Sequence, residues 1–249
     1  MSKRILWVTL ITMVLVGLTG LAQADAMLPT AVAADFSSGN LTGGSVSYLP
    51  AIGNSFTVMG APIATVQQFP SDQFFPLFGA YINLQTGGCF QGCFYNSGSG
   101  TTNSFFNDGG NLQLWGALNQ NQNPYLLLDA TWNHNAGDPY FGQPDCQFTG
   151  VSLNSHTGTG GLRGCLTIDF VDPALLAMLN FPGNTFTGDG FLTQMDFQLS
   201  FDPNTGWAGA VKSSDLIIHE RVPEPSSLAL FGAGLMSLGT LARKKLARR

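Results

Sequence analysis

Four cysteines are the residues whose chemistry is most restricted by their type and spacing: Cys89, Cys93, Cys146 and Cys165. Four cysteines allow three disulfide connectivities, and short sequence separation favours Cys89 with Cys93 and Cys146 with Cys165. Each bond would stabilise the fold by about 2 to 3 kcal/mol, because it restricts the unfolded chain. A metal site is the alternative, but Cys89-x-x-x-Cys93 lacks a matching second pair and the three histidines show no ligand spacing. We therefore predict disulfides, which leave no thiol for cysteine catalysis.

Other catalytic groups give no recognisable active site. A serine hydrolase places its nucleophile in a Gly-x-Ser-x-Gly turn between a strand and a helix, whereas Ser99 lies in a polar stretch with no helix after it. Glycosidases need two carboxylates about 5 to 10 Å apart. Residues 26–221 carry thirteen acidic side chains, so some pair will reach that separation by chance. We predict that the protein is not an enzyme. The aspartates considered for this role are Asp129, Asp138, Asp145, Asp169 and Asp196.

Calcium is the one cofactor that the sequence leaves open, because this ion prefers oxygen ligands from Asp, Asn and loop carbonyls. Asp202, Asn204 and the loop 138–145 are the places where it would bind. No segment fits an EF-hand or a calcium-binding repeat. Asp and Asn also hydrogen-bond their own backbone in turns, and we favour this role, so no cofactor is predicted.

Aromatic side chains could stack on sugar rings if they were exposed, although most aromatic residues of a β domain lie in its core. Trp132 precedes the polar segment 133–135 and is therefore the best surface candidate. Rings alone do not define a binding site, and we name none from them. The residues considered are Trp115, Trp132, Trp207, Tyr125 and Tyr140.

The elements that would position these residues are short alternating runs separated by turn residues about every ten positions, which is typical of an all-β domain. Apolar and polar residues alternate over 191–201, and the turn 202–206 predicts a hairpin with 207–218. Ten strands are enough for two packed sheets, so we predict an antiparallel, jelly-roll-like β-sandwich. The other expected strands are 45–49, 55–59, 63–69, 80–84, 112–117, 125–132, 146–153 and 166–171.

Two segments interrupt the strands. Residues 173–179 form the one helical candidate, with Asp172 as its N-cap and Pro173 at its first position. Residues 87–110 contain seven glycines among Asn, Ser and Thr, and we expect a long loop partly fixed by the Cys89–Cys93 disulfide.

Charge is segregated along the chain. Residues 26–221 contain three basic and thirteen acidic side chains, so their formal charge is 3 − 13 = −10, against −5 for the whole chain. A surface of this sign repels phosphate backbones, which argues against nucleic-acid binding. It suits cations or neutral sugars better.

The N-terminal residues 1–24 are typical of a secretory signal peptide: Lys3 and Arg4, then the apolar run 5–21, then Ala22-Gln23-Ala24. Cleavage is expected after Ala24 or Ala26. An uncleaved anchor is the alternative, because the 17-residue run is at the lower limit for spanning a bilayer. Export places the cysteines in an oxidising compartment.

The C-terminal residues 222–249 have three parts. A proline-containing segment, 222–227, precedes an uncharged run of 15 residues, 228–242, and a basic end, 243–249. The run is long enough to form a marginal transmembrane helix, and the positive charge after it predicts a cytoplasmic tail. The domain 25–221 is then on the outer side of the membrane. The basic residues are Arg243, Lys244, Lys245, Arg248 and Arg249.

This order of segments resembles the PEP-CTERM sorting domain of Gram-negative bacteria, with Val222, Pro223, Glu224 and Pro225 as its motif. The resemblance covers about 28 residues and implies processing by an exosortase, a membrane protease that cuts near the tripeptide. It further implies passage through the inner membrane, then release from the cell or attachment at its surface. Proteins with this signal commonly occur in organisms that make exopolysaccharide and biofilm matrix.

Together these features predict a structural or adhesive protein of the exopolysaccharide-associated matrix. A module that binds the cell's own exopolysaccharide, with or without calcium, is the alternative. The expected partners are exosortase, matrix components and, before processing, the membrane.

Overall fold

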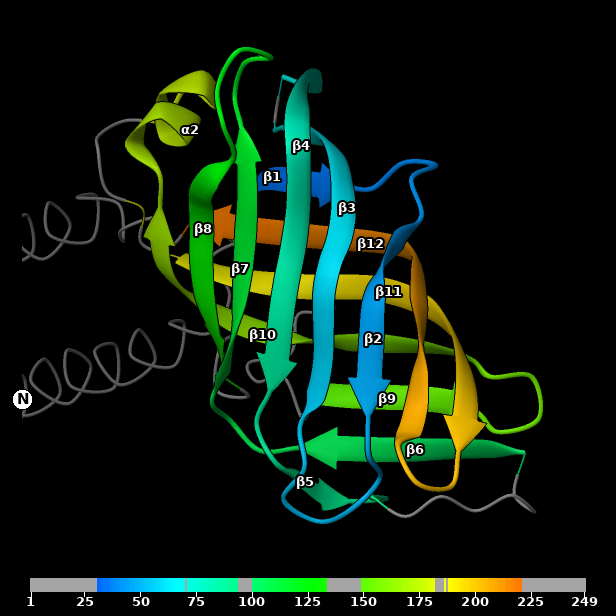
Figure 1. The fold of residues 1–249 in the computed structure, drawn as a ribbon. Coiled ribbons are helices and arrows are strands. Elements are labelled where there is room, and N and C mark those ends of the chain that lie inside the picture. The colour runs from blue at the N-terminus through cyan, green and yellow to red at the C-terminus, as the bar shows by residue number, and fades with distance from the viewer. Residues whose placement is uncertain are drawn as a thin grey trace, which may run out of the picture. The chain divides into compact units, whose positions relative to one another are not determined.

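A computed structural model describes residues 31–69, 71–93, 100–133, 149–181, 186 and 188–220 of the chain (Figure 1). Residues Thr30–Arg221 form one compact unit. The predicted signal peptide, the sorting segment, the loop 138–145 and the residues Tyr140 and Cys146 lie outside the described residues.

The described elements are strands and one short helix. The strands are β1 (Ala31–Ser37), β2 (Gly43–Tyr48), β3 (Phe56–Gln68), β4 (Gln73–Thr86), β5 (Cys89–Gln91), β6 (Thr101–Phe106), β7 (Gly110–Ala117), β8 (Tyr125–Trp132), β9 (Thr149–Asn154), β10 (Thr159–Val171), β11 (Gly188–Asp202) and β12 (Gly206–Glu220). The helix is α2 (Pro173–Met178).

Eight of the strands close into a barrel in which all neighbours are antiparallel. They follow one another as β2-β3-β4-β7-β8-β10-β11-β12, and β12 pairs back with β2. The chain therefore runs up and down around the barrel in sequence order, with β5, β6 and β9 inserted between its strands. Closure pairs the backbone groups that an open sheet would leave unpaired at its two edges.

The strands β1 and β2 fill one position of the barrel in succession. Along β12, residues 207–211 pair with β2 and residues 215–220 pair with β1. Along β3, residues 56–59 pair with β2 and residues 65–68 pair with β1. Residues 31–48 therefore act as one long strand interrupted at 38–42. The strand β1 was not predicted, because its first four residues, 31–34, are all apolar and show no alternation of apolar and polar side chains.

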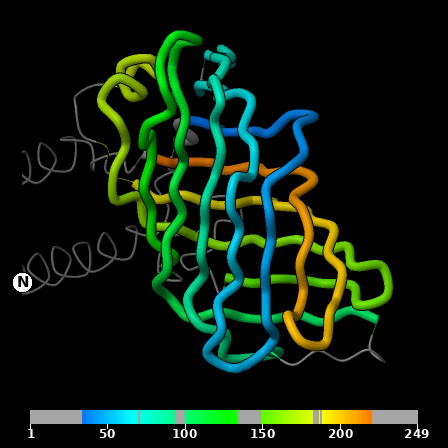
Figure 2. Tube along the Cα trace, in the orientation of Figure 1, coloured from blue at the N-terminus to red at the C-terminus, as the bar shows by residue number. Residues whose placement is uncertain are grey.

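The prediction of an antiparallel all-β fold is confirmed, but the strand pairing gives a closed barrel rather than the two separate sheets of a jelly-roll-like sandwich. Figures 1 and 2 show a front layer of β2, β3, β4, β7 and β8, whose strands cross those of a rear layer of β1, β12, β11 and β10. β11 and β12 have 15 residues each, and both bend between the layers. Register shifts at 196/197 and 209/211 accompany these bends. Strands that belong to both layers make one continuous sheet.

A small extension of the sheet replaces part of the loop that was expected over residues 87–110. β9 pairs with the first half of β10, β6 pairs with β9, and β5 pairs with β6. The ring of Phe106 on β6 lies 5.7 Å from that of Tyr48 on β2, so the extension packs against the barrel. The expectation of a loop was wrong for β5 and β6, because pairing with a distant strand compensates for the glycine-rich composition.

The hairpin of β11 and β12 confirms the strongest strand prediction. Asp202 caps the turn by accepting hydrogen bonds from the backbone N–H groups of Asn204 (2.7 Å) and Thr205 (3.1 Å). A register shift between Leu192 and Gln194 changes the phase of the alternation, so Leu192 is buried although the simple pattern placed it outside.

The remaining predicted elements are confirmed with adjusted bounds. The strand 125–132 was predicted with the bounds that β8 has, while the predicted strands 55–59 and 63–69 are two parts of the single strand β3. Asp172 caps α2, accepting from the N–H groups of Ala174 (2.9 Å) and Leu175 (3.1 Å).

Inward-facing side chains fill the barrel. Large side chains from opposite layers, including Phe36, Phe56 and Phe197, have exposures of 0 to 1%. Trp132 is also fully buried, and its Nε1 donates to the carbonyl of Gln85 at 2.9 Å. The expectation that Trp132 is a surface residue was therefore wrong. Its position on β8, in phase with Leu128 and Ala130, directs it into the core.

Candidate functional site

The outer surface of three adjacent barrel strands carries an ordered set of aromatic and polar side chains. On β4, β7 and β8 the inward residues are Ile82, Leu84, Leu112, Leu114, Leu128 and Ala130, all in the core. The alternate residues face outward. Across the strands, Tyr81 lies opposite Trp115, Asn83 lies opposite Gln113, and Gln113 lies opposite Asp129. We call the surface formed by Tyr81, Asn83, Gln113, Trp115 and Asp129 the β4–β7–β8 face.

Hydrogen bonds fix the side chains of this face. The indole Nε1 of Trp115 donates to Oε1 of Gln113 at 3.3 Å. The backbone N–H of Gly60 donates to Oδ1 of Asn83 at 2.8 Å. Because both amide oxygens accept within the protein, the amide NH2 groups are the groups that can donate to a ligand. The face thus combines half-buried rings with oriented donors.

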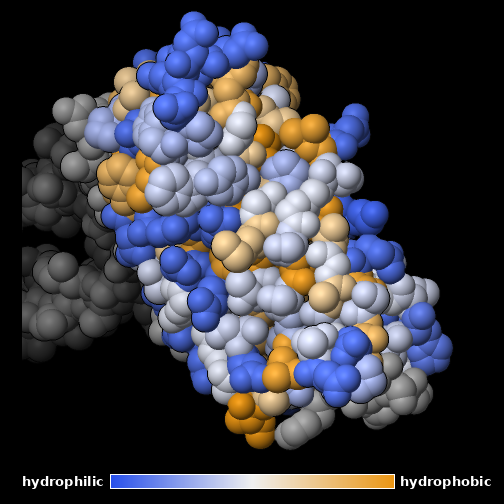
Figure 3. All heavy atoms as spheres, viewed as in Figure 1, coloured by the Kyte–Doolittle hydropathy of each residue, from blue (hydrophilic) through white to orange (hydrophobic). Residues whose placement is uncertain are grey.

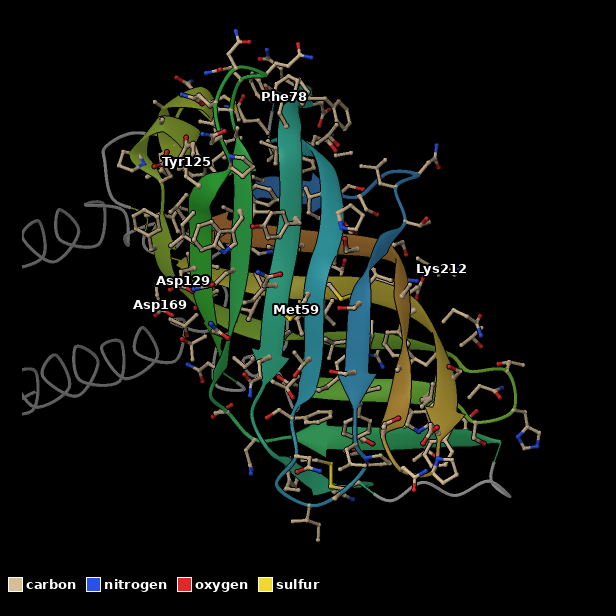
Figure 4. The ribbon with its side chains drawn as sticks, viewed as in Figure 1. Met59, Phe78, Tyr125, Asp129, Asp169 and Lys212 are labelled. Atoms are coloured by element: carbon tan, nitrogen blue, oxygen red, sulfur yellow. A yellow bond between two sulfur atoms is a disulfide. The ribbon has the colours of Figure 1, made fainter. Side chains whose placement is uncertain are left out.

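Acidic groups border the face on the side of β8 and β10. Figure 4 shows Asp129 on β8 close to Asp169 on β10, with Tyr125 higher along β8 and Met59 further across the front layer. Thr131 donates from Oγ1 to Oδ2 of Asp169 at 2.6 Å. Burial raises the pKa of Tyr125, and the neighbouring carboxylate of Asp172 raises it further. Figure 3 shows weakly polar and apolar residues over the middle of this layer, with strongly hydrophilic residues along its left side.

Basic side chains are scarce near the face. Within the part of the chain that the structure describes, Arg163 on β10 and Lys212 on β12 are the only Lys or Arg residues. None is on β3, β4, β7 or β8. The local potential is therefore negative, which disfavours anionic ligands.

The aspartates considered for glycosidase chemistry do not form a common cluster on one element. Asp196 accepts from Gln194 (2.6 Å) and Ser213 (3.1 Å) on the β11–β12 hairpin, whereas Asp129 belongs to the β4–β7–β8 face and Asp169 lies beside it. Asp138 and Asp145 lie outside the described residues.

Of the places considered for calcium, the structure describes one, the turn at Asp202 and Asn204. There the Asp202 carboxylate accepts hydrogen bonds from the backbone N–H groups of Asn204 and Thr205. Among residues 31–133 and 149–220, apart from the undescribed gaps within them, no group of three or more His, Cys, Asp or Glu side chains is close enough to hold a metal ion. Turn formation is the role that the geometry gives to Asp202.

A small cavity lies where β2 and β12 approach β6 and β9, lined in part by Tyr48, Ser104 and Trp207. Its volume is about 10 Å³, which is room for about one water molecule. This cavity is too small for a sugar, so the core beside it is not a candidate for a polysaccharide ligand.

Two carboxyl groups meet beside the pairing of β1 with β12. Oδ1 of Asp35 and Oδ1 of Asp215 are both buried and receive no hydrogen bond from a donor, while Oδ2 of Asp215 accepts from Thr193 at 2.9 Å. Burial, and after it a hydrogen bond and charge repulsion from the adjacent Asp215, together raise the pKa of Asp35 to about 8. A pKa of about 8 leaves the Asp35 carboxyl group largely protonated at neutral pH. This pair could not be predicted from the sequence, because nothing local relates residues 35 and 215.

The predicted disulfide between Cys89 and Cys93 is confirmed, with a Cα–Cα distance of 5.8 Å. It fixes the beginning of the extension, where Cys89 belongs to β5. Cys165 on β10 is also disulfide-bonded, and its expected partner Cys146 lies outside the described residues.

Trp115 and Asp129 were considered from the sequence, whereas Tyr81, Asn83 and Gln113 of the β4–β7–β8 face were not. Trp207 is buried, and Tyr125 is half-buried at the edge of the face. The alternation of Tyr81 and Asn83 with Ile82 and Leu84 was the available signal, but only the strand register places Tyr81 beside Trp115.

None of the described helices is long and apolar enough to cross a bilayer, and the predicted transmembrane segment 228–242 lies outside the described residues. The last barrel strand, β12, ends at Glu220. Glu220 pairs with Ala31 of β1 and with Gly188 of β11, so the strand is held on both sides up to its end.

Directly after this strand, residues 221–245 match the PEP-CTERM protein-sorting motif. The match confirms the resemblance drawn from the sequence. A motif of this class implies an exported protein that is processed by an exosortase and sorted to the cell surface. Comparisons with curated proteins and with solved structures give no match.

Proposed function

We propose that this protein is a structural or adhesive component of the extracellular matrix, made by a Gram-negative bacterium that produces exopolysaccharide. The observation that carries the proposal is the sorting motif at 221–245, placed directly after a closed and disulfide-bonded β domain. A closed barrel with a filled interior suits a durable extracellular part.

The proposal assigns no catalytic step to the domain. Asp196 is hydrogen-bonded within the β11–β12 hairpin, and Asp169 is hydrogen-bonded to Thr131, which are structural uses of both carboxylates. Incubation of the purified protein with the cell's own polymer should release no new reducing ends. Release that depends on Asp129 or Asp169 would replace this proposal with a hydrolytic one.

Sorting can be tested by the intact mass of the protein taken separately from membranes and culture supernatant. We expect a surface or supernatant species that begins near Asp25 and ends near Pro223. A membrane species that retains residues 228–249 would make the protein a permanently anchored one.

The matrix role is tested by deleting the gene and measuring matrix composition, attachment and aggregation. We expect a weaker matrix, restored by the wild-type gene. A matched control gene carries Pro223→Ala and Pro225→Ala, which leave the described domain unchanged and should restore less. A deletion strain that equals the wild type in all three properties would contradict the proposed role.

A second candidate function is recognition of the cell's own exopolysaccharide. The β4–β7–β8 face favours it, because half-buried rings and oriented amides are chemically suited to sugars. In one form of this second function, calcium assists the binding of the polysaccharide. Repeating the binding assay with a chelator tests whether calcium is needed.

A further inference from the structure

The β4–β7–β8 face has the arrangement of a shallow platform rather than a pocket. Tyr81 and Trp115 lie opposite each other on β4 and β7, and both side chains are partly exposed. The next pair along the same strands is Asn83 with Gln113, followed by Gln85 with Asn111. One aromatic pair is thus continued by two pairs of amides.

The spacing of these rows is set by the strands. Successive outward residues on a strand are about 6.6 Å apart, and neighbouring strands are about 4.8 Å apart. A ligand that follows the strands therefore meets a ring surface first and then amides at regular intervals. An extended polymer with hydroxyl groups along its length satisfies this pattern better than a single compact molecule.

The hydrogen bonds show which groups the platform offers. Trp115 donates to Gln113, and Gly60 donates to Asn83, so the indole N–H and these two amide oxygens already have partners. Amide NH2 groups remain as donors to ligand hydroxyls, and the carboxylate of Asp129 at the border can accept from them. Apolar ring faces complement the C–H face of a sugar, because that face is not hydrogen-bonding.

Charge selects the class of polymer. Asp129 and Asp169 border the platform, and the two described basic residues, Arg163 and Lys212, lie on other strands. A uronic-acid or sulfated polymer would bring negative charge to this border. The repulsion between like charges makes binding of such a polymer less favourable. A neutral polymer brings no such repulsion.

From these observations we infer that the β4–β7–β8 face binds a neutral polysaccharide, which stacks a sugar ring on Tyr81 and Trp115 and hydrogen-bonds to Asn83 and Gln113. This inference deepens the second candidate function by naming the site and the ligand class. It stands apart from the matrix role, because purified protein and defined polymers test the binding and a gene deletion tests the role.

The test is calorimetric titration of the exported protein, purified from the producing cells, with neutral hydroxyethylcellulose, laminarin and dextran, and with anionic polygalacturonate. We expect binding heat with at least one neutral polymer and affinity at least about tenfold lower for polygalacturonate. Equal or tighter binding of polygalacturonate would overturn the assignment of a neutral ligand. No heat with any of the three neutral polymers would overturn the site itself.

Variants locate the binding. Trp115→Ala should weaken it at least about tenfold, and Gln113→Ala should weaken it about threefold, with thermal melting to establish that each variant is folded. The matched control is Phe74→Ala, because Phe74 is an exposed aromatic residue on the same strand, β4, but pairs with Gln67 away from the platform. Unchanged affinity in folded Gln113→Ala and Trp115→Ala, or an equal loss in Phe74→Ala, would overturn the proposed site.

Discussion

Replacing Asp35 by Asn should remove a pH dependence of stability that its buried carboxyl group creates. The pKa of Asp35 is raised from 3.8 to about 8 in the folded protein, first by burial and then by Asp215. Below pH 3.8 the folded and unfolded states are both protonated at this site. As the pH rises toward about 8, the unfolded state releases the proton while the folded state retains it, so the free energy of unfolding falls. Above about 8 the loss is complete.

The size of the effect follows from the pKa change. A full shift from 3.8 to about 8 would correspond to about 6 kcal/mol. Asp35 is only partly buried, so solvent screening reduces the expected loss to about 2 to 3 kcal/mol. For a domain of this size, that loss lowers the melting temperature by about 5 to 10 °C. In Asp35→Asn the amide is neutral at every pH and can donate to the Asp215 carboxylate, so this contribution disappears.

The assay is thermal unfolding followed by circular dichroism at pH 4.5, 6.5 and 8.5. Relative to Asp35→Asn, the wild type should lose about 5 to 10 °C between the lowest and highest pH. Asp169→Asn is the matched control, because Asp169 is an exposed strand aspartate, and this variant should follow the wild type. Parallel curves for the wild type and Asp35→Asn would refute the raised pKa of Asp35.

Three further changes test the parts of the fold. Replacing Cys89 and Cys93 together by Ser should lower the free energy of unfolding by about 2 kcal/mol, because the bond closes a short loop; chemical denaturation measures this loss, and an unchanged midpoint would contradict it. Trp132→Ala should cost about 3 to 5 kcal/mol, since it opens a cavity and leaves the Gln85 carbonyl without its donor. A cost below about 1 kcal/mol would show that the indole is not core. Asp172→Ala should cost about 1 kcal/mol through loss of the α2 N-cap, and Asp172→Asn should retain most of that stability in the same denaturation assay.

Sequence patterns predicted those elements whose ends are set by residues nearby in the chain, such as turn and capping residues. The hairpin of β11 and β12 follows from alternation and from the Asp202 turn, and α2 follows from Asp172 and Pro173. The closed barrel could not be predicted in this way. It depends on the pairing of β12 with β2 and β1, which are almost the whole domain apart from β12 in sequence.

In the candidate site, too, local features could be predicted from the sequence and long-range pairing could not. Trp132 and Trp115 have the same chemistry, but Trp132 is in phase with Leu128 and Ala130 and is buried, while Trp115 faces outward beside Gln113. The alternation of inward and outward residues along each strand can be read from the sequence. It is a better guide to the burial of Trp132 than the polar residues that follow Trp132. The register that brings Tyr81 to Trp115 was not available, because bulges shift it between strands.

The end of β12 also sets how far the sorting enzyme must reach. Glu220 is paired on both sides, and Pro223 is only three residues further along the chain. Three residues span at most about 10 Å even when fully extended. If the exosortase cuts near the tripeptide, it must work within about 10 Å of the end of β12 in the folded barrel, or act before β12 is in place. Any later attachment at that cut would leave only about three residues of chain between the last barrel strand and the attachment point.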